Sequence, residues 1–293
     1  MNTMEQENPY NPNNNLITNI DVLNILKKYN IVNVPVNDIT KFISAFTHKS
    51  YMKSTYNYTE DEFATFKFIS GSKVLDLQES CYEELEFYGD SVLDFITVMY
   101  ISDRFPGQSE GFYTKLKSKI VNGASLSRLA KKLDFHHFVL ISQHVEEKFG
   151  RFSEKILEDV FEAFIGALFR DQPNKFKSFT VCYEFIYNIL NNVQDDFDYG
   201  ELIMYDNNYK DQLLRYYNAH KLGHPTYREV SVEESTNMKI FSVGIVNPQI
   251  SGAILPPTDT KQYIYVAVGS TKKKAEQLAA KEALRYFGVL NEA

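Results

Sequence analysis

The chain has 293 residues, of which 44% are hydrophobic and 24% are charged, enough for one large domain or two ordinary ones with a sizeable core. It contains no run of 18 or more apolar residues, so no membrane-spanning helix is expected. Its two cysteines have neither zinc-ligand spacing nor the pattern of a disulfide framework, which is typical of a reducing compartment. We expect an intracellular protein, cytoplasmic or nuclear, without a membrane partner.

The net charge of −7 is unevenly distributed along the chain. Residues 1–204 hold 20 Lys and Arg against 29 Asp and Glu, whereas residues 205–293 hold 11 against 9. An acidic first part and a mildly basic second part indicate two domains with different tasks.

Residues 1–18 are polar and Asn-rich and are predicted to form a disordered leader. Beyond them, apolar residues at three- and four-residue spacing predict a series of helices. The stretch 52–80 has mixed character and is predicted to be a loop with short elements. The expected helices lie at 21–29, 38–46, 81–105, 111–133 (as one or two helices), 153–171 and 175–190.

The polar and acidic residues 194–206 are the best candidate for a linker between two domains, 19–193 and 207–290. After the linker, a short helix at 209–220 precedes three segments rich in strand-type residues. A strongly periodic helix, begun by Ser270 or Thr271, closes the chain. This α-β-β-β-α order indicates a three-stranded antiparallel sheet backed by two helices.

The stretch 81–95, "CYEELEFYGDSVLDF", places acids among large apolar side chains. With Glu83 at 0° on a helix, Glu86 falls at about 300°, Asp90 at about 340° and Asp94 at about 20°, so the acids share one stripe. The other positions are nearly all apolar, which predicts a helix that is buried on almost every side. Buried carboxylates of like charge are costly unless something pairs them.

The expected helix at 153–171 repeats this pattern. Asp159 and Glu162 lie on one face, and Gly166 continues that face without a side chain, which would let another helix or a ligand come close. Two interpretations remain open for these acids. They form ion pairs with Lys or Arg on neighbouring helices, or they hold a hard divalent cation such as Mg²⁺, which takes oxygen ligands and serves phosphoryl transfer.

Four segments carry a resemblance to a known family. "EELEFYGDSVL" (83–93) closely resembles the signature of ribonuclease III, the double-stranded-RNA endonuclease family, and "KILEDVFEAFIGALF" (155–169) resembles its second acidic helix. "FTHKSY" (46–51) and "LKSKIVNGASLSRLA" (116–130) match segments upstream of the signature and between the two helices. The resemblance implies an all-α ribonuclease III endonuclease domain, followed by an α+β (α-β-β-β-α) double-stranded-RNA-binding domain.

The resemblance also implies roles for individual residues. Glu83 matches an acid that supports the structure and the subunit interface. Lys155 sits where eukaryotic-type members often have a lysine near the scissile phosphate, although an i,i+4 ion pair with Asp159 explains it equally well. The four acids that match the Mg²⁺-binding set, with Mn²⁺ as a substitute, are Glu86, Asp90, Asp159 and Glu162, of which Asp90 and Glu162 are expected to be catalytic.

The C-terminal block "GSTKKKAEQLAAKEAL" (269–284) resembles a double-stranded-RNA-binding domain, in which Lys272 and Lys273 occupy positions that grip phosphates. Lys274, Gln212 and Asn237 are further expected RNA contacts. Such domains read the shape of an A-form duplex over ~16 base pairs, mostly without sequence preference.

Two departures from the family pattern bear on structure. Tyr82 stands where the signature usually has an Asn, which is expected to change a hydrogen bond beside the site. Residues 52–80 make the spacing before the signature longer than usual, so an insertion is expected there.

The resemblance implies a homodimer with one site in each subunit, cutting duplex RNA to 5′-phosphate and 3′-hydroxyl ends with two-nucleotide 3′ overhangs. The alternative is a catalytically silent relative that sequesters duplex RNA or serves as a structural ribonucleoprotein subunit. Silent relatives characteristically lose some of the acids, whereas all four are present here.

Overall fold

The computed structural model divides the chain into two compact units, Met1–Ile203 and Met204–Ala293. The boundary falls within the segment predicted to be a linker, residues 194–206, which itself lies outside the described residues. The residues that the structure describes are 7–71, 73–192, 208–235, 238–248, 256 and 259–290.

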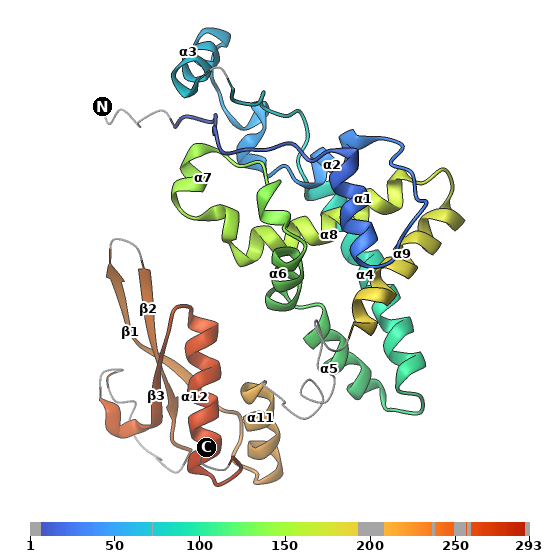
Figure 1. Ribbon diagram of the computed structural model, residues 1–293. Coiled ribbons are helices and arrows are strands. Elements are labelled where there is room, and N and C mark those ends of the chain that lie inside the picture. The colour runs from blue at the N-terminus through green and yellow to red at the C-terminus, as the bar shows by residue number, and fades with distance from the viewer. Residues whose placement is uncertain are drawn as a thin grey trace. The chain divides into compact units, whose positions relative to one another are not determined.

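The first unit is helical, as the sequence predicts (Figure 1). The segment 111–133 forms two helices, because the Asn122 side chain accepts a hydrogen bond from the Ser125 N–H and caps the second one. Short 3₁₀ turns, η1 (Lys49–Tyr51), η2 (Lys53–Thr55), η3 (Phe135–His137) and η4 (Gly150–Phe152), connect some of the helices. The helices are α1 (Asn19–Lys28), α2 (Ile39–Ala45), α3 (Glu60–Ser70), α4 (Glu83–Arg104), α5 (Glu110–Ile120), α6 (Gly123–Lys132), α7 (Gln143–Glu147), α8 (Glu154–Asp171) and α9 (Lys175–Asn191).

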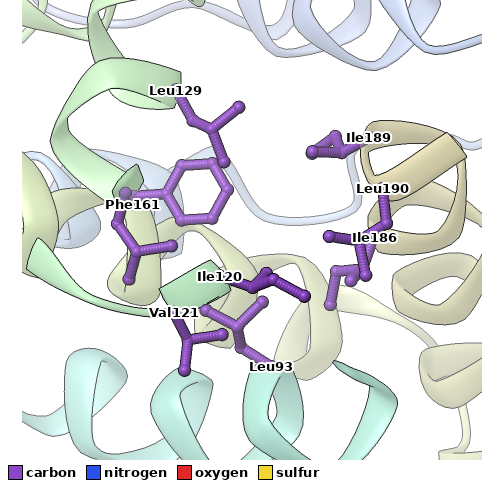
Figure 2. A pocket seen from close by; sticks show the side chains of 9 residues that line it. Leu93, Ile120, Val121, Leu129, Phe161, Ile186, Ile189 and Leu190 are labelled. Atoms are coloured by element: carbon purple, nitrogen blue, oxygen red, sulfur yellow. The ribbon is translucent and has the colours of Figure 1, made fainter. Parts of the chain in front are cut away.

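Helices α4 and α8 pack against each other at the centre of this unit, and α2, α6 and α9 pack on α8. Figure 2 shows the side chains that line an apolar cavity in this core, among them Leu93 of α4, Phe161 of α8 and Ile189 of α9. The cavity has a volume of about 10 Å³. A space of that size with hydrocarbon walls offers a water molecule no polar partner. The part of the core between α4, α8 and α9 is therefore close-packed and offers no site for water.

One face of α4 contradicts the prediction that this helix is buried on almost every side. Phe87, Phe95 and Val98 are exposed, whereas Leu93 and Ile96 on other faces are buried. The three exposed side chains fall within about 80° of one another around the helix. We call Phe87, Phe95 and Val98 the α4 apolar strip.

The segment 52–80, predicted to be a loop with short elements, contains the three-turn helix α3. The Thr59 side chain accepts from the Glu62 N–H, and the Glu62 side chain accepts from the Thr59 N–H, so the helix begins with a capping box. Phe63 alone among its residues is buried, in a small cluster with Tyr51 and Leu77. A helix is recognised in a sequence by apolar residues that recur on its buried face. With one buried side chain, α3 has no such recurrence, so the sequence did not reveal it.

The prediction of a disordered leader at residues 1–18 is wrong for residues 7–18, which the structure describes as packed chain. Tyr10, Asn11, Asn14 and Ile17 are buried. Asn14 pairs with the backbone of Ile141 in both directions, donating to its carbonyl oxygen at 2.9 Å and accepting from its N–H at 3.2 Å. These asparagines therefore act as specific hydrogen-bonding groups, which composition alone could not reveal.

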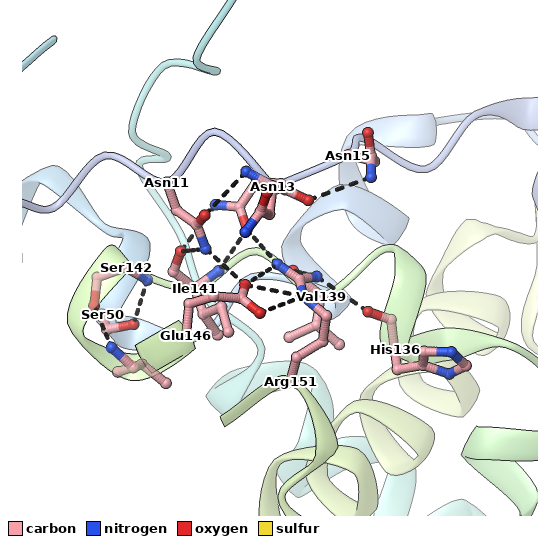
Figure 3. A network of polar contacts seen from close by, with 12 residues as sticks. Asn11, Asn13, Asn15, Ser50, His136, Val139, Ile141, Ser142, Glu146 and Arg151 are labelled. Atoms are coloured by element: carbon pink, nitrogen blue, oxygen red, sulfur yellow. Dashed lines mark hydrogen bonds and ion pairs between the residues drawn. The ribbon is translucent and has the colours of Figure 1, made fainter. Parts of the chain in front are cut away.

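Figure 3 shows the polar network that anchors this segment. The Asn11 amide donates to the Ile141 carbonyl oxygen at 3.1 Å and to Glu146 Oε2 at 2.8 Å. The Arg151 guanidinium donates to Glu146, to Asn14 and to the carbonyl oxygen of Val139. The pKa of Glu146 is lowered: burial raises it, but the hydrogen bonds from Arg151 and Asn11 outweigh that effect. The N-terminal segment thus holds the chain that leads into α8.

The second unit has the predicted α-β-β-β-α order. Its strands pair antiparallel in the order β1-β2-β3, and α11 and α12 share a core with the sheet that includes Leu213, Tyr217 and Ile245. Thr271, and not Ser270, caps the last helix, since its side chain accepts from the Lys274 N–H. The elements are α11 (Tyr209–Ala219), β1 (Tyr227–Ser235), β2 (Met238–Val246), the 3₁₀ turn η5 (Thr260–Gln262), β3 (Tyr263–Gly269) and α12 (Lys272–Tyr286).

Over the part of the chain that the structure describes, no helix combines the length and the apolar character that crossing a membrane requires.

We predict that Asn11→Ala lowers the free energy of unfolding by about 1–3 kcal/mol, because Ile141 and Glu146 lose a buried hydrogen-bond donor. Asn15→Ala is the matched control, since the Asn15 side chain is exposed and bonds to the carbonyl oxygen of Asn13. Urea denaturation followed by circular dichroism measures both. Identical curves for the two variants would show that the N-terminal segment does not stabilise the unit.

Candidate functional site

The two acidic helices touch through their backbones. A Cβ atom added to Gly89 on α4 would lie 1.8 Å from the Glu162 carbonyl oxygen, and one added to Gly166 on α8 would lie 2.1 Å from the Leu85 carbonyl oxygen. No side chain fits at such distances, so glycine is required at both points of contact. The expectation that Gly166 lets another helix come close is confirmed.

This close approach brings three of the four predicted ligands together. Carboxylate oxygens of Glu86, Asp159 and Glu162 lie within 4.8 Å of one another. Asp159 is 6% exposed and Glu162 is 8% exposed, whereas Glu86 is half-buried. Asp90, one turn beyond Glu86 on α4, is exposed and lies outside this group.

Burial and mutual repulsion disfavour the charged forms of these acids. Burial, followed by the charge of Asp90, raises the pKa of Glu162 to about 8. Burial and the neighbouring Asp159 raise the pKa of Glu86, and burial and Asp94 raise that of Asp90. Glu162 therefore retains a proton near neutral pH when no cation lies beside it.

Lys155 places an ammonium group among the acids. Its Nζ lies 2.6 Å from Asp159 Oδ1, 3.8 Å from Glu86 Oε1 and 3.6 Å from Glu158 Oε2. The hydrogen bond to Asp159 raises the pKa of Lys155, so the group stays charged. The i,i+4 ion pair is confirmed, but the side chain is 67% exposed and can leave this position.

Tyr82 holds Asp159 from the other side. Its hydroxyl donates to Asp159 Oδ2, with 3.1 Å between the oxygens. The sequence marked Tyr82 as a departure from the family pattern, but nothing in the sequence identified Asp159 as its partner.

Two acids of the α4 stripe have ordinary ion pairs. Asp94 Oδ2 lies 2.6 Å from Lys117 Nζ, and Glu83 Oε1 lies 3.6 Å from Lys49 Nζ. For these two residues the ion-pair interpretation holds, and neither belongs to the group formed by Glu86, Asp159 and Glu162.

The arrangement of Glu86, Asp159 and Glu162 fits a hard divalent cation. The donors are carboxylate oxygens, which Mg²⁺, Mn²⁺ and Ca²⁺ prefer. Three acids face one exposed ammonium, so the group has negative charge in excess that a divalent ion would neutralise. A second possible ligand group, Asp134 with His136 and His137, is more exposed, and its carboxylate is paired with Lys28 at 3.0 Å.

In the second unit, Lys272, Lys273 and Lys274 are exposed at the first turn of α12. Lys272 Nζ lies 3.2 Å from Glu229 Oε2 on β1. Gln212 is half-buried on α11, and Asn237 lies outside the described residues. The three lysines and the helix N-terminus together present positive charge to solvent, as phosphate binding requires.

Comparison with known proteins extends this picture. Residues 83–173 match the model of the ribonuclease III domain, and residues 209–287 match the double-stranded RNA binding motif. The Ribonuclease 3 of Nitratiruptor sp. is 32% identical over 210 residues, which cover 72% of this chain and 84% of that protein. The chain belongs to the ribonuclease III family. It combines a nuclease domain with a double-stranded-RNA-binding domain, as its sequence predicts, and its relatives support endoribonuclease activity.

Two further similarities describe the relatives. The "Probable ribonuclease 3" of Acanthamoeba polyphaga mimivirus is 31% identical over 281 residues, 95% of this chain, but the chain spans 47% of that protein's length. The nuclease domain of ribonuclease III from Campylobacter jejuni is 27% identical, with a TM-score of 0.43, and the match covers 57% of this chain and 94% of that domain.

We predict that Gly166→Ala destabilises the first unit by about 1–3 kcal/mol or more, because its methyl group would overlap the Leu85 carbonyl oxygen and force α4 and α8 apart. Gly111→Ala on α5 is the matched control: its Cβ would meet open space, so it should be neutral or stabilising by about 0.5–1 kcal/mol. Thermal unfolding of both variants tests this. Equal melting temperatures would rule out the backbone contact.

Proposed function

We propose that the protein is a Mg²⁺-dependent endonuclease that cleaves double-stranded RNA into short duplexes with 5′-phosphate and 3′-hydroxyl ends and two-nucleotide 3′ overhangs. The observation that carries the proposal is the grouping of Glu86, Asp159 and Glu162 within 4.8 Å, with the charge of Asp90 acting on Glu162. Family membership supplies the substrate class, and the carboxylates supply the ligands for the ion.

In this proposal, Glu86, Asp90, Asp159 and Glu162 hold Mg²⁺, with Mn²⁺ as a substitute. The chemistry that the bound ion supplies is activation of a water molecule and stabilisation of the leaving oxygen. The chain's own residues orient the reacting groups: Asp159 and Glu162 are buried on α8, so the packing around this helix restricts both side chains. Lys155, once released from Asp159, is long and exposed enough to contact the scissile phosphate.

A homodimer completes the proposal. The α4 apolar strip exposes two phenylalanines and a valine on the helix that also carries Glu86 and Asp90. Phe176 on α9 is exposed as well, and the Phe95 ring contacts Phe179 of α9 at 6.1 Å between centroids. Exposed apolar side chains gathered on neighbouring helices in this way favour a protein partner. In a dimer, the α4 apolar strip of one copy would pack against the same strip of the other. Two sites would then lie on one duplex, so that both RNA strands could be cut.

In the second unit, Lys272 and Lys273 are proposed to contact phosphates, with Lys274, Gln212 and Asn237 as further contacts. Exposure of the three lysines at the start of α12 supports this assignment. Phosphate contacts of this kind give binding that weakens as salt rises and that does not depend on base sequence.

We predict that Glu162→Gln reduces Mg²⁺-dependent cleavage of a long RNA duplex by about 10²- to 10³-fold or more, because a buried ligand charge is removed. A labelled duplex on a denaturing gel measures the loss. Glu154→Gln, an exposed acid in the first turn of α8, is the control and should cut at the parent rate.

Duplex binding by Glu162→Gln should remain at the parent level in a gel shift with Ca²⁺ or EDTA. Cleavage at the parent rate by this variant would refute the assignment of the acids. A parent protein that binds duplex but leaves it intact in Mg²⁺ would instead support the catalytically silent relative.

We predict that Lys272→Ala combined with Lys273→Ala weakens duplex binding and reduces the slope of log affinity against log salt by about two, one for each lost phosphate contact. Lys261→Ala is the control. Lys261 precedes β3, whereas α12 follows the end of β3, so this exposed lysine lies at the opposite end of the sheet from Lys272. Unchanged affinity in the double variant would remove these lysines from the RNA-binding surface.

A further inference from the structure

The carboxylate of Asp159 is held from two sides. Lys155 Nζ lies 2.6 Å from Oδ1, and the Tyr82 hydroxyl donates to Oδ2 across 3.1 Å. Each oxygen of this buried acid therefore has its own partner, and the two partners come from different parts of the chain.

These partners differ in their freedom to move. Lys155 is 67% exposed, and its ammonium also lies within 4 Å of Glu86 and Glu158, so it can exchange between water and several acids. Tyr82 is 4% exposed and is fixed at both ends of its backbone. Its N–H donates to the Thr47 carbonyl oxygen at 2.9 Å, and its own carbonyl oxygen accepts from the Glu86 N–H at 2.8 Å.

The Tyr82 ring is also confined. It lies 5.7 Å from the His48 ring between centroids, and it belongs to the main hydrophobic core of the first unit. Its hydroxyl, at the far end of the ring, donates to Asp159, so the side chain is held at its tip as well as at its base.

We propose that Tyr82 is a positioning residue for the candidate metal centre: its hydroxyl fixes Oδ2 of Asp159, so that Oδ1 stays directed at the position for a cation. Lys155 occupies that position in the absence of a metal ion. When the ammonium gives way to a divalent cation, the bond from Tyr82 is retained and holds the carboxylate in the orientation that the ion needs. This inference rests on the metal site of the function proposed above.

The consequence concerns metal affinity more than stability. Hydrogen bonds that orient a metal-binding carboxylate typically change metal affinity about 10- to 100-fold when they are removed. Without the hydroxyl, the Asp159 carboxylate can rotate about its last torsion, which is broad for this side chain. We therefore expect Tyr82→Phe, which deletes one oxygen atom, to weaken metal binding while leaving the apolar packing of the ring in place.

The test is a calorimetric titration of the metal-stripped full chain with Mn²⁺, without RNA. Tyr82→Phe should bind Mn²⁺ about 10-fold or more weakly than the parent chain. Tyr100→Phe is the matched control, because Tyr100 is also buried on α4 and its hydroxyl donates to the carbonyl oxygen of Leu190 at 3.0 Å. This control should stay within about twofold of the parent, since the partners of its hydroxyl are Leu190 and Asn191 and none of the three acids.

Lys155→Met gives a second result that does not depend on how well Tyr82→Phe folds. Removing the competing ammonium should leave Mn²⁺ affinity unchanged or make it tighter, and a loss of affinity would overturn the roles given to Lys155 and Tyr82. If the parent binds Mn²⁺ and Tyr82→Phe binds it equally well, the positioning role is wrong and the metal site stands. A parent chain that binds no Mn²⁺ would overturn both.

Discussion

The contact between the backbones of α4 and α8 is the constraint on which the candidate site depends. Leu85 and Gly89 on α4 meet Glu162 and Gly166 on α8, and in each helix the two contact residues are four apart. Glu86 and Asp90 directly follow the contact residues of α4, and Glu162 is itself a contact residue. Helical geometry therefore places these acids beside the contact between the two helices. The close approach of the backbones explains both why glycine is required and why the carboxylates are grouped.

Bringing these acids together raises the free energy of the metal-free fold. The raised pKa of Glu162 expresses this directly, since its charged form is disfavoured by burial and by Asp90. Lys155 and Tyr82 offset part of the cost at Asp159, one by charge and the other by a hydrogen bond. Apolar packing around α8 stabilises the fold and offsets the destabilisation caused by the grouped acids. Such a trade-off between stability and function is common at functional sites.

The features that the sequence predicted correctly depend on local patterns. The helices of the first unit other than α3 and α7, the α-β-β-β-α order of the second unit and the shared face of Asp159 and Glu162 all follow from residue spacing within one element. The features it missed depend on partners far along the chain. Asn11 and Asn14 are fixed by Ile141, Glu146 and Arg151, which lie more than a hundred residues away and have no pattern in common with them. Similarly, no periodicity distinguishes an apolar α4 face that packs in the core from one that remains exposed.

The distribution of charge explains why one chain contains both units. A group of carboxylates repels the phosphates on which the proposed chemistry acts, and the first 204 residues have an excess of acids overall. In the proposed function, a divalent ion and Lys155 offset most of this negative charge locally, over a range that salt limits to about 8–10 Å. Attraction over a whole duplex therefore requires basic groups elsewhere, and in the proposed function the lysines at the start of α12 provide them in a separate unit. In this proposal, binding strength and cleavage chemistry can change independently, because the lysines assigned to duplex binding lie in the second unit and the acids assigned to cleavage lie in the first.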